Sequence, residues 1–129
     1  MSHTVPILIL EDNEIDVEIA KRVLKKGNIS NPFYAVADGV EALKALKGDG
    51  TEKIPQPCII LIDINLPRMD GFTFLEEVQN DPELKDNIAF MLTTSNREED
   101  MNKAYSLNAA GYILKDEIDM LGKAISDYV

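Results

Sequence analysis

Apolar segments of this sequence are repeatedly followed by residues that can take part in metal or phosphoryl chemistry. Glu11 and Asp12 follow the first such segment, and Asp63 follows a later one. Thr93 and Lys115 hold the same position after two further segments. Each residue alone has an ordinary interpretation, as a helix cap, a turn residue, a strand residue or a solvated lysine. Their shared position after apolar segments predicts that they form one site.

The electrostatics of this set predict a bound cation. Two carboxylates about 4 Å apart repel each other by roughly 4 kcal/mol at an effective dielectric constant of about 20. Glu11, Asp12 and Asp63 would have only Lys115 to offset them. The candidate ligands are all oxygen atoms, and the sequence contains a single histidine, His3, and a single cysteine. We therefore expect a hard ion such as Mg²⁺ rather than zinc or copper.

Asp63 is the candidate nucleophile of this site. A carboxylate can attack phosphorus and form an aspartyl phosphate. The metal and Lys115 would neutralise the transferring group, and Thr93 would donate a hydrogen bond to it. Phosphoryl transfer depends mainly on positioning and charge stabilisation, so this chemistry does not require a catalytic histidine.

Alternating strand-length and helix-length segments are predicted to position these residues. The strand-length segments are apolar throughout, and they span residues 5–10, 33–37, 58–62, 88–92 and 111–114. Apolar residues at helical spacing follow each of them: Ile15, Ile19, Val23 and Leu24; Val40, Leu43, Ala45 and Leu46; Phe72, Phe74, Leu75 and Val78; Met101, Ala104, Tyr105 and Leu107; Ile118, Leu121, Ile125 and Tyr128. This pattern predicts a parallel sheet covered by helices on both faces, which is a doubly wound α/β fold. Such folds bind ligands at the carboxyl ends of their strands, where the candidate residues lie.

Polar residues mark the expected helix boundaries. Asp38 and Ser95 each stand three residues before a glutamate, which is the spacing of a capping box. Asn80-Asp81-Pro82 is expected to end a helix, and residues 48–57 are expected to form a long loop before the third strand.

The composition limits the class of protein. A chain of 129 residues, 45% of them hydrophobic, predicts one domain with one site. The formal net charge of −10 disfavours nucleic-acid binding. Cys58 has no cysteine partner within the chain, which indicates a reducing compartment. The first ten residues lack a basic segment, and no segment approaches the roughly 20 apolar residues of a membrane span. We therefore expect a soluble, cytoplasmic protein with no membrane association.

These motifs resemble the receiver domain of two-component response regulators. The resemblance rests on Glu11-Asp12, the block IILIDINLPRMDG at residues 59–71, Thr93 in MLTTS and Lys115 in GYILKDE, and it covers nearly the whole chain. It implies a flavodoxin-like (βα)5 fold, with five parallel strands in the order 2-1-3-4-5. It also implies a single receiver domain over residues 1–129 without an effector domain. The short form and the LTTS segment are most similar to the small regulators paired with bacterial phytochrome-type histidine kinases.

The resemblance assigns roles to the phosphoryl and metal site. Asp63 would accept a phosphoryl group from a phosphohistidine on a sensor histidine kinase or phosphotransfer protein. Asp12 and Asp63 would bind Mg²⁺ directly, together with the main-chain carbonyl of Asn65. Glu11 would act through a bound water. Lys115 would contact the phosphoryl oxygens.

The resemblance also implies how the signal leaves the site. Thr93 would hydrogen-bond a phosphoryl oxygen, and Tyr112 would be the switch aromatic that turns inward as Thr93 moves. The face built from the fourth helix, fifth strand and fifth helix would then change the relative populations of its conformations. The protein would phosphorylate itself and dephosphorylate slowly rather than act as a turnover enzyme. It would signal through an unidentified downstream protein, and homodimerisation is left open.

Two residues depart from the usual receiver pattern. Asp116 follows Lys115 where the family usually has a proline, commonly after a cis peptide. A cis bond before another residue costs about 2.5–4 kcal/mol, which favours a trans peptide here. Asp116 also brings a negative charge near the phosphate. Thr94 is bulkier than the small residue that usually follows the switch threonine, so we predict slower dephosphorylation.

Three alternative functions are weighed against the receiver. A haloacid-dehalogenase-type phosphatase needs a second acid two residues after its nucleophile, where this chain has Asn65. A flavodoxin-like cofactor carrier needs a phosphate cradle in its first loop, but residues 11–14 carry acidic groups that would repel phosphate. A degenerate receiver that only binds a partner would not need the complete set of site residues.

Overall fold

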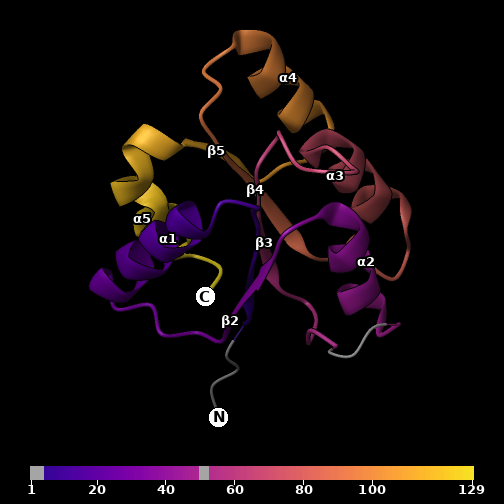
Figure 1. Ribbon diagram of the computed structural model, residues 1–129, viewed down its shortest axis with the longest axis horizontal. Coiled ribbons are helices and arrows are strands. Elements are labelled where there is room, and N and C mark those ends of the chain that lie inside the picture. Colours follow the sequence, from indigo (N-terminus) through magenta and orange to yellow (C-terminus); the bar gives the residue numbers. More distant parts are fainter. Residues whose placement is uncertain (1–4, 50–52) are drawn as a thin grey trace.

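Strands and helices alternate along the described part of the chain. The computed structural model describes residues 5–49 and 53–129 (Figure 1). Its elements are β1 (Ile7–Leu10), α1 (Glu14–Lys26), β2 (Phe33–Val36), α2 (Gly39–Lys47), β3 (Ile59–Ile62), α3 (Gly71–Asn80), β4 (Ile88–Thr93), α4 (Glu98–Ser106), β5 (Gly111–Leu114), η1 (Lys115–Met120) and α5 (Leu121–Ile125). His3 and part of the predicted loop at 48–57 lie outside the described residues. No helix in the described ranges has both the length and the apolar composition to cross a membrane.

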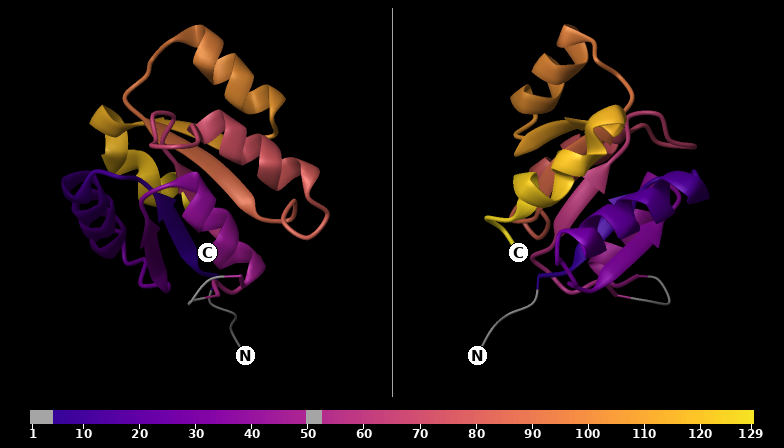
Figure 2. Two further views of the ribbon diagram at one scale, coloured as in Figure 1. Left: turned by 45° about the vertical axis from the view of Figure 1, so that its right-hand side comes forward. Right: turned by 90° about the vertical axis from the view of Figure 1, so that its left-hand side faces the viewer.

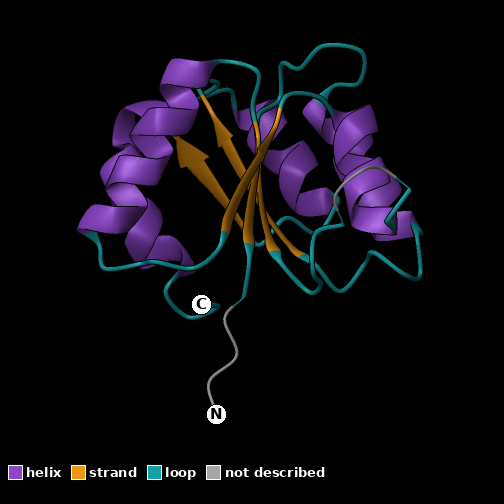
Figure 3. Ribbon diagram, turned by 60° about the horizontal axis from the view of Figure 1, so that its bottom comes forward, coloured by secondary structure: helices purple, strands orange, loops and turns teal. Residues whose placement is uncertain are grey.

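The five strands form one parallel sheet in the order β2-β1-β3-β4-β5. This order confirms the predicted flavodoxin-like fold. Helices α1 and α5 cover one face of the sheet, and α2, α3 and α4 cover the other (Figures 1, 2 and 3). Because both faces are covered, every residue of β1 and β3 is buried. The strand segments of the sequence are therefore apolar throughout because helices cover both faces of the sheet.

The strand register brings the expected site residues to one edge of the sheet. Leu10 at the end of β1 pairs with Ile62 at the end of β3. The ladder continues past this pair, because the Asp63 amide donates to the Leu10 carbonyl at 3.2 Å. Glu11 and Asp63 therefore lie next to each other at the carboxyl ends of β1 and β3.

The capping-box pattern of the sequence predicts the start of α2 but not the start of α4. Asp38 caps α2 by accepting from the Glu41 amide, as the capping-box pattern predicts. The same prediction for Ser95 is wrong, because α4 begins only after Arg97. The Ser95 hydroxyl instead donates to the Asp100 carboxylate at 2.6 Å, inside the first turn of α4.

The predicted fifth helix is divided into two segments. The 3₁₀ segment η1 comes first and the short helix α5 follows it, while Tyr128 lies beyond the helix end. Neither Leu114 nor Met120, at the two N-cap positions, supplies a capping side chain, and Glu117 departs from helical backbone angles. A segment without a cap has less to hold its first turn in regular α-helical form.

Candidate functional site

Lys115 lies at the centre of a cluster of carboxylates. Its ammonium nitrogen is 2.5 Å from Glu11 Oε1, 2.9 Å from Asp16 Oδ2 and 3.1 Å from Asp63 Oδ2. Lysine has three N–H donors, so each carboxylate can take one. The structure thus brings together Glu11, Asp63 and Lys115, as the sequence predicts, and adds Asp16 from α1.

The cluster is shielded from solvent. Glu11 and Asp63 are only 5% and 8% exposed. Burial raises the pKa of Glu11, and the hydrogen bonds from Lys115 and the Asn13 amide offset this only in part. Burial opposes the charge of Lys115, but hydrogen bonds to the three carboxylates outweigh it and raise the lysine pKa above its usual value. Lys115 is therefore a permanent cation of the site at neutral pH.

The Asp63 carboxylate is held on both of its oxygens. Oδ1 accepts a hydrogen bond from the Ile64 amide at 2.7 Å, and Oδ2 faces Lys115. The loop after Asp63 folds back tightly, because the Gly71 amide donates to the Ile64 carbonyl at 2.8 Å. Asp70 then caps α3 by accepting from the Thr73 amide. The start of α3 and the nucleophile candidate are therefore parts of one compact turn.

The expected metal ligands are only partly assembled. Within residues 5–49 and 53–129, no three Asp, Glu, His or Cys side chains are gathered as a ready metal site. Asp12 and Asn65 are exposed, whereas Glu11 and Asp63 are buried beside Lys115. The donor chemistry fits a hard divalent ion, because the available ligands are carboxylate and carbonyl oxygens.

Ser95 links the two predicted switch residues. Thr93 is fully buried at the end of β4, and its hydroxyl accepts from the Ser95 amide at 3.4 Å. The Tyr112 hydroxyl donates to the Ser95 carbonyl at 2.8 Å. Thr93 makes no hydrogen bond to Asp63 or Lys115, so the switch residues are joined to each other but not to the phosphoacceptor candidate. The sequence around Ser95 carries only a capping pattern, which gives no signal of these contacts.

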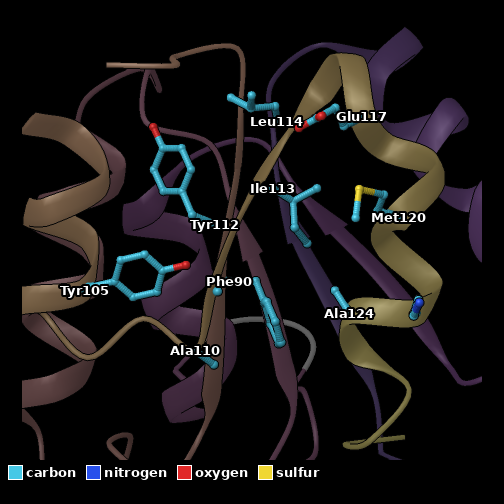
Figure 4. A pocket seen from close by; sticks show the side chains of 11 residues that line it. Phe90, Tyr105, Ala110, Tyr112, Ile113, Leu114, Glu117, Met120 and Ala124 are labelled. Atoms are coloured by element: carbon cyan, nitrogen blue, oxygen red, sulfur yellow. The ribbon is translucent and has the colours of Figure 1, made fainter. Parts of the chain in front are cut away.

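A groove lies over β5 between α4 and α5 (Figure 4). It has a volume of about 460 Å³. Tyr105 projects from the α4 side and Met120 from the η1 and α5 side, with Tyr112 and Ile113 between them on β5. Tyr105 and Met120 are 51% and 58% exposed. This is the face from which the resemblance implies output.

The apolar residues that predict α1 are not all buried. Ile15 and Ile19, two of the apolar residues whose spacing predicts this helix, are 71% and 39% exposed. The residues that α1 buries are Ala20 and Leu24. Two isoleucines are therefore presented to solvent on the helix that also carries Asp16.

The two departures from the receiver pattern have simple structural outcomes. Among the described residues the only cis peptide is Gln56–Pro57, so the peptide between Lys115 and Asp116 is trans, as its predicted cost suggests. Lys115 nevertheless reaches Asp63. Asp116 and Thr94 are both exposed.

Comparison with known proteins identifies the family. Residues 7–126 match the model of the response regulator receiver domain. The chain is 36% identical over 110 residues to response regulator Rcp1 of Synechocystis sp., covering 84% of this chain and 75% of Rcp1.

Solved structures agree with this match. The Mn²⁺-bound form of Rcp1 aligns with a TM-score of 0.83 and 33% identity, covering 95% of this chain and 92% of that one. The phosphorylated cyanobacterial phytochrome response regulator RcpA aligns with a TM-score of 0.84 and 30% identity, covering 98% of this chain and 94% of RcpA. The bacteriophytochrome response regulator AtBRR aligns with a TM-score of 0.83 and 32% identity, covering 98% of this chain and 93% of AtBRR. The chain belongs to the receiver domain family of two-component response regulators, a family of signalling domains rather than of turnover enzymes.

Proposed function

We propose that Asp63 accepts a phosphoryl group from a phosphohistidine of a partner protein. An oxygen of Asp63 forms the new bond to phosphorus while the bond from phosphorus to the imidazole nitrogen breaks, and its electron pair stays on the imidazole. The observation that carries this proposal is the contact of the Lys115 ammonium with Asp63 at 3.1 Å in a shielded cluster. Lys115 can move its donor from the carboxylate to a phosphoryl oxygen without leaving the site.

A divalent ion, most suitably Mg²⁺, is proposed to complete the site. Asp12 and Asp63 would bind it directly with the main-chain carbonyl of Asn65, and Glu11 would act through a bound water. When bound, the ion supplies positive charge to the phosphoryl oxygens. The all-oxygen donor set supports this choice. The Mn²⁺-bound form of the relative Rcp1 supports a divalent site in the same fold.

The signal is proposed to leave through Thr93, Ser95 and Tyr112. A hydrogen bond from Thr93 to the new phosphoryl group would draw its hydroxyl away from the Ser95 amide. Ser95 also binds Tyr112 and the first turn of α4. Release of one contact would therefore change the relative populations of two arrangements of this face. Residues 1–129 would act as a single receiver domain that signals through a downstream protein.

The proposed phosphoryl donor is a sensor histidine kinase, of the phytochrome type, or a phosphotransfer protein. The alignment with RcpA supports the phytochrome-type kinase. The exposed Ile15 and Ile19 supply an apolar surface for the donor on α1, the helix that carries Asp16 beside Lys115. If this surface receives the donor, Ile15→Ala should slow transfer from the phosphorylated partner and leave phosphorylation by acetyl phosphate unchanged.

The proposal is tested by incubation with acetyl phosphate and Mg²⁺ followed by intact mass measurement. The wild type should gain one phosphoryl group, and Asp63→Asn should gain none. A wild type that gains no mass would favour a receiver that only binds a partner. A phosphorylated Asp63→Asn variant would place the acceptor on another residue.

A further inference from the structure

Asp16 contacts the Lys115 ammonium but has no part in the proposed phosphoryl and metal chemistry. Its Oδ2 is 2.9 Å from the lysine nitrogen, closer than Asp63 at 3.1 Å. Asp16 lies in the first turn of α1, so this contact joins a helix to the residue that follows β5. The separation of 99 residues along the chain makes it a tertiary contact rather than a local one.

A closed ring of hydrogen bonds fixes the position of Asp16. Glu11 Oε2 accepts from the Asn13 amide at 3.0 Å, and Asn13 Oδ1 accepts from the Asp16 amide at 3.1 Å. Asp16 then accepts from Lys115, and Lys115 contacts the other oxygen of Glu11. The cap of α1 thereby sets where the Asp16 carboxylate can reach.

The other two carboxylates around Lys115 change during the proposed reaction. In the proposed reaction an oxygen of Asp63 becomes bonded to phosphorus, and Glu11 would also serve the metal site through a bound water. Asp16 has no part in either of these steps, so its contact with Lys115 can persist through them. Lysine has a flexible four-carbon stem, so an ammonium that loses two partners needs another to hold its orientation.

We propose that Asp16 is a positioning residue, which holds the Lys115 ammonium against the transferring phosphoryl group while Asp63 and Glu11 change partners. This inference rests on the proposed function of Asp63. The contact is more than an exposed ion pair, since the side chains of Lys115 and Asp16 are only 15% and 34% exposed. A fully exposed pair would be screened and would orient little.

Two variants of Asp16 and one control test the proposal. Asp16→Asn removes the charge with little change of shape. Asp16→Ala removes the contact and keeps a strong helix former in α1. Glu14→Gln is the control, because Glu14 is the other acidic residue of the first turn and is exposed. It makes the same change of charge next to the same helix end without touching Lys115.

The first measurement is the phosphorylation rate at saturating Mg²⁺ and acetyl phosphate, so that weaker metal binding does not enter. Both Asp16 variants should be about tenfold slower than wild type, because a misplaced catalytic group commonly costs this much or more. Glu14→Gln should stay within about twofold of wild type, as a surface change away from the reacting atoms. In a Lys115→Ala background, Asp16→Ala should cause no further slowing, because it acts through the lysine.

The second measurement needs no phosphorylation. In the metal-free protein, NMR of ¹⁵N-labelled Lys115 should show its ammonium signal shifted and its protons exchanging faster in Asp16→Ala than in wild type. Wild-type rates in both Asp16 variants, or equal slowing in the Lys115→Ala background, would overturn the proposal. Failure of the wild type to take up phosphate at all would instead overturn the function of Asp63. An unchanged ammonium signal in Asp16→Ala would overturn the positioning role by itself.

Discussion

Gly71 is predicted to be required for the geometry of Asp63 because its own Cβ position is occupied. A Cβ built there would lie 2.1 Å from the Asp63 carbonyl oxygen and 2.9 Å from the Asp63 carbonyl carbon. Such contacts are not seen below 3.0 Å, so the two backbones must separate by at least 3.0 − 2.1 = 0.9 Å. Both partners are backbone, and no flexible side chain can absorb this shift.

Gly71→Ala should therefore damage both stability and chemistry. Overpacking of this kind costs about 1–3 kcal/mol of unfolding free energy or somewhat more. A displacement close to 1 Å at the nucleophile can cost about 100-fold in rate. Urea denaturation followed by circular dichroism measures the first effect, since the chain has no tryptophan. Mass measurement of acetyl phosphate reactions at temperatures where the variant stays folded measures the second.

Gly122→Ala is the matched control for the same substitution. The nearest atom to a Cβ at Gly122 is Ile29 Cδ1 at 3.6 Å, an ordinary contact. In helix α5 this change should be neutral or stabilise by up to about 1 kcal/mol, with a wild-type phosphorylation rate. The reasoning is refuted if Gly71→Ala is as stable and as reactive as wild type. It is also refuted if Gly71→Ala and Gly122→Ala lose the same amount of unfolding free energy and of phosphorylation rate.

Further predictions concern three other residues. Burial raises the pKa of Cys58 from 9.0 to about 12. Above about pH 9 the unfolded thiol ionises and the folded one does not, so unfolding free energy should fall by up to about 1.4 kcal/mol per pH unit. In urea titrations Cys58→Ala should not show this fall of unfolding free energy with pH. An equal fall in Cys58→Ala and wild type would contradict the prediction. Thr94→Ala should speed decay of the aspartyl phosphate by removing steric cover, and equal or slower decay would sink that idea. Tyr112→Phe should lower unfolding free energy by about 1 kcal/mol through loss of its bond to Ser95, with unchanged stability counting against the bond.

The sheet was predictable because its cause is local in sequence. A strand covered on both faces must be apolar at every position, and the apolar segments therefore mark the strands to within one or two residues. The largest difference is at β1, which begins at Ile7 rather than at Val5, and Thr93 is the last residue of β4 rather than the first beyond it. The strand order came from the resemblance, because periodicity does not specify which strands are neighbours.

The packing of α1 was less predictable, because helical spacing identifies a helix more reliably than its buried face. Ile15 and Ile19 repeat at the spacing of a core stripe but are exposed, while the small residue Ala20 is fully buried. Which residues of α1 enter the core depends on how the helix is placed against the sheet rather than on hydrophobicity alone.

The site shows the same division between local and tertiary causes. Glu11, Asp63 and Lys115 could be grouped from the sequence because each follows a strand of one sheet, and parallel strands end at one edge. Asp16 lies inside a helix, and its partner Lys115 is 99 residues away along the chain, so only the tertiary fold brings the two together. Ser95 matches a capping pattern but lies before the start of α4, and its hydroxyl binds the Asp100 carboxylate in the first turn of that helix.

The charge balance of the cluster connects its structure to the order of the proposed reaction. Three carboxylates surround one ammonium, so the contacts of Lys115 leave two negative charges in excess. A phosphoryl donor brings further negative charge toward this surplus, and Glu11 and Asp63 are too shielded for water to screen it fully. Lys115 cannot serve all three carboxylates and the incoming oxygens with three donors. If Asp12 and Asp63 hold a divalent ion before the donor arrives, with Glu11 acting through a water, Lys115 would be free to turn to the phosphoryl group while Asp16 holds it in place.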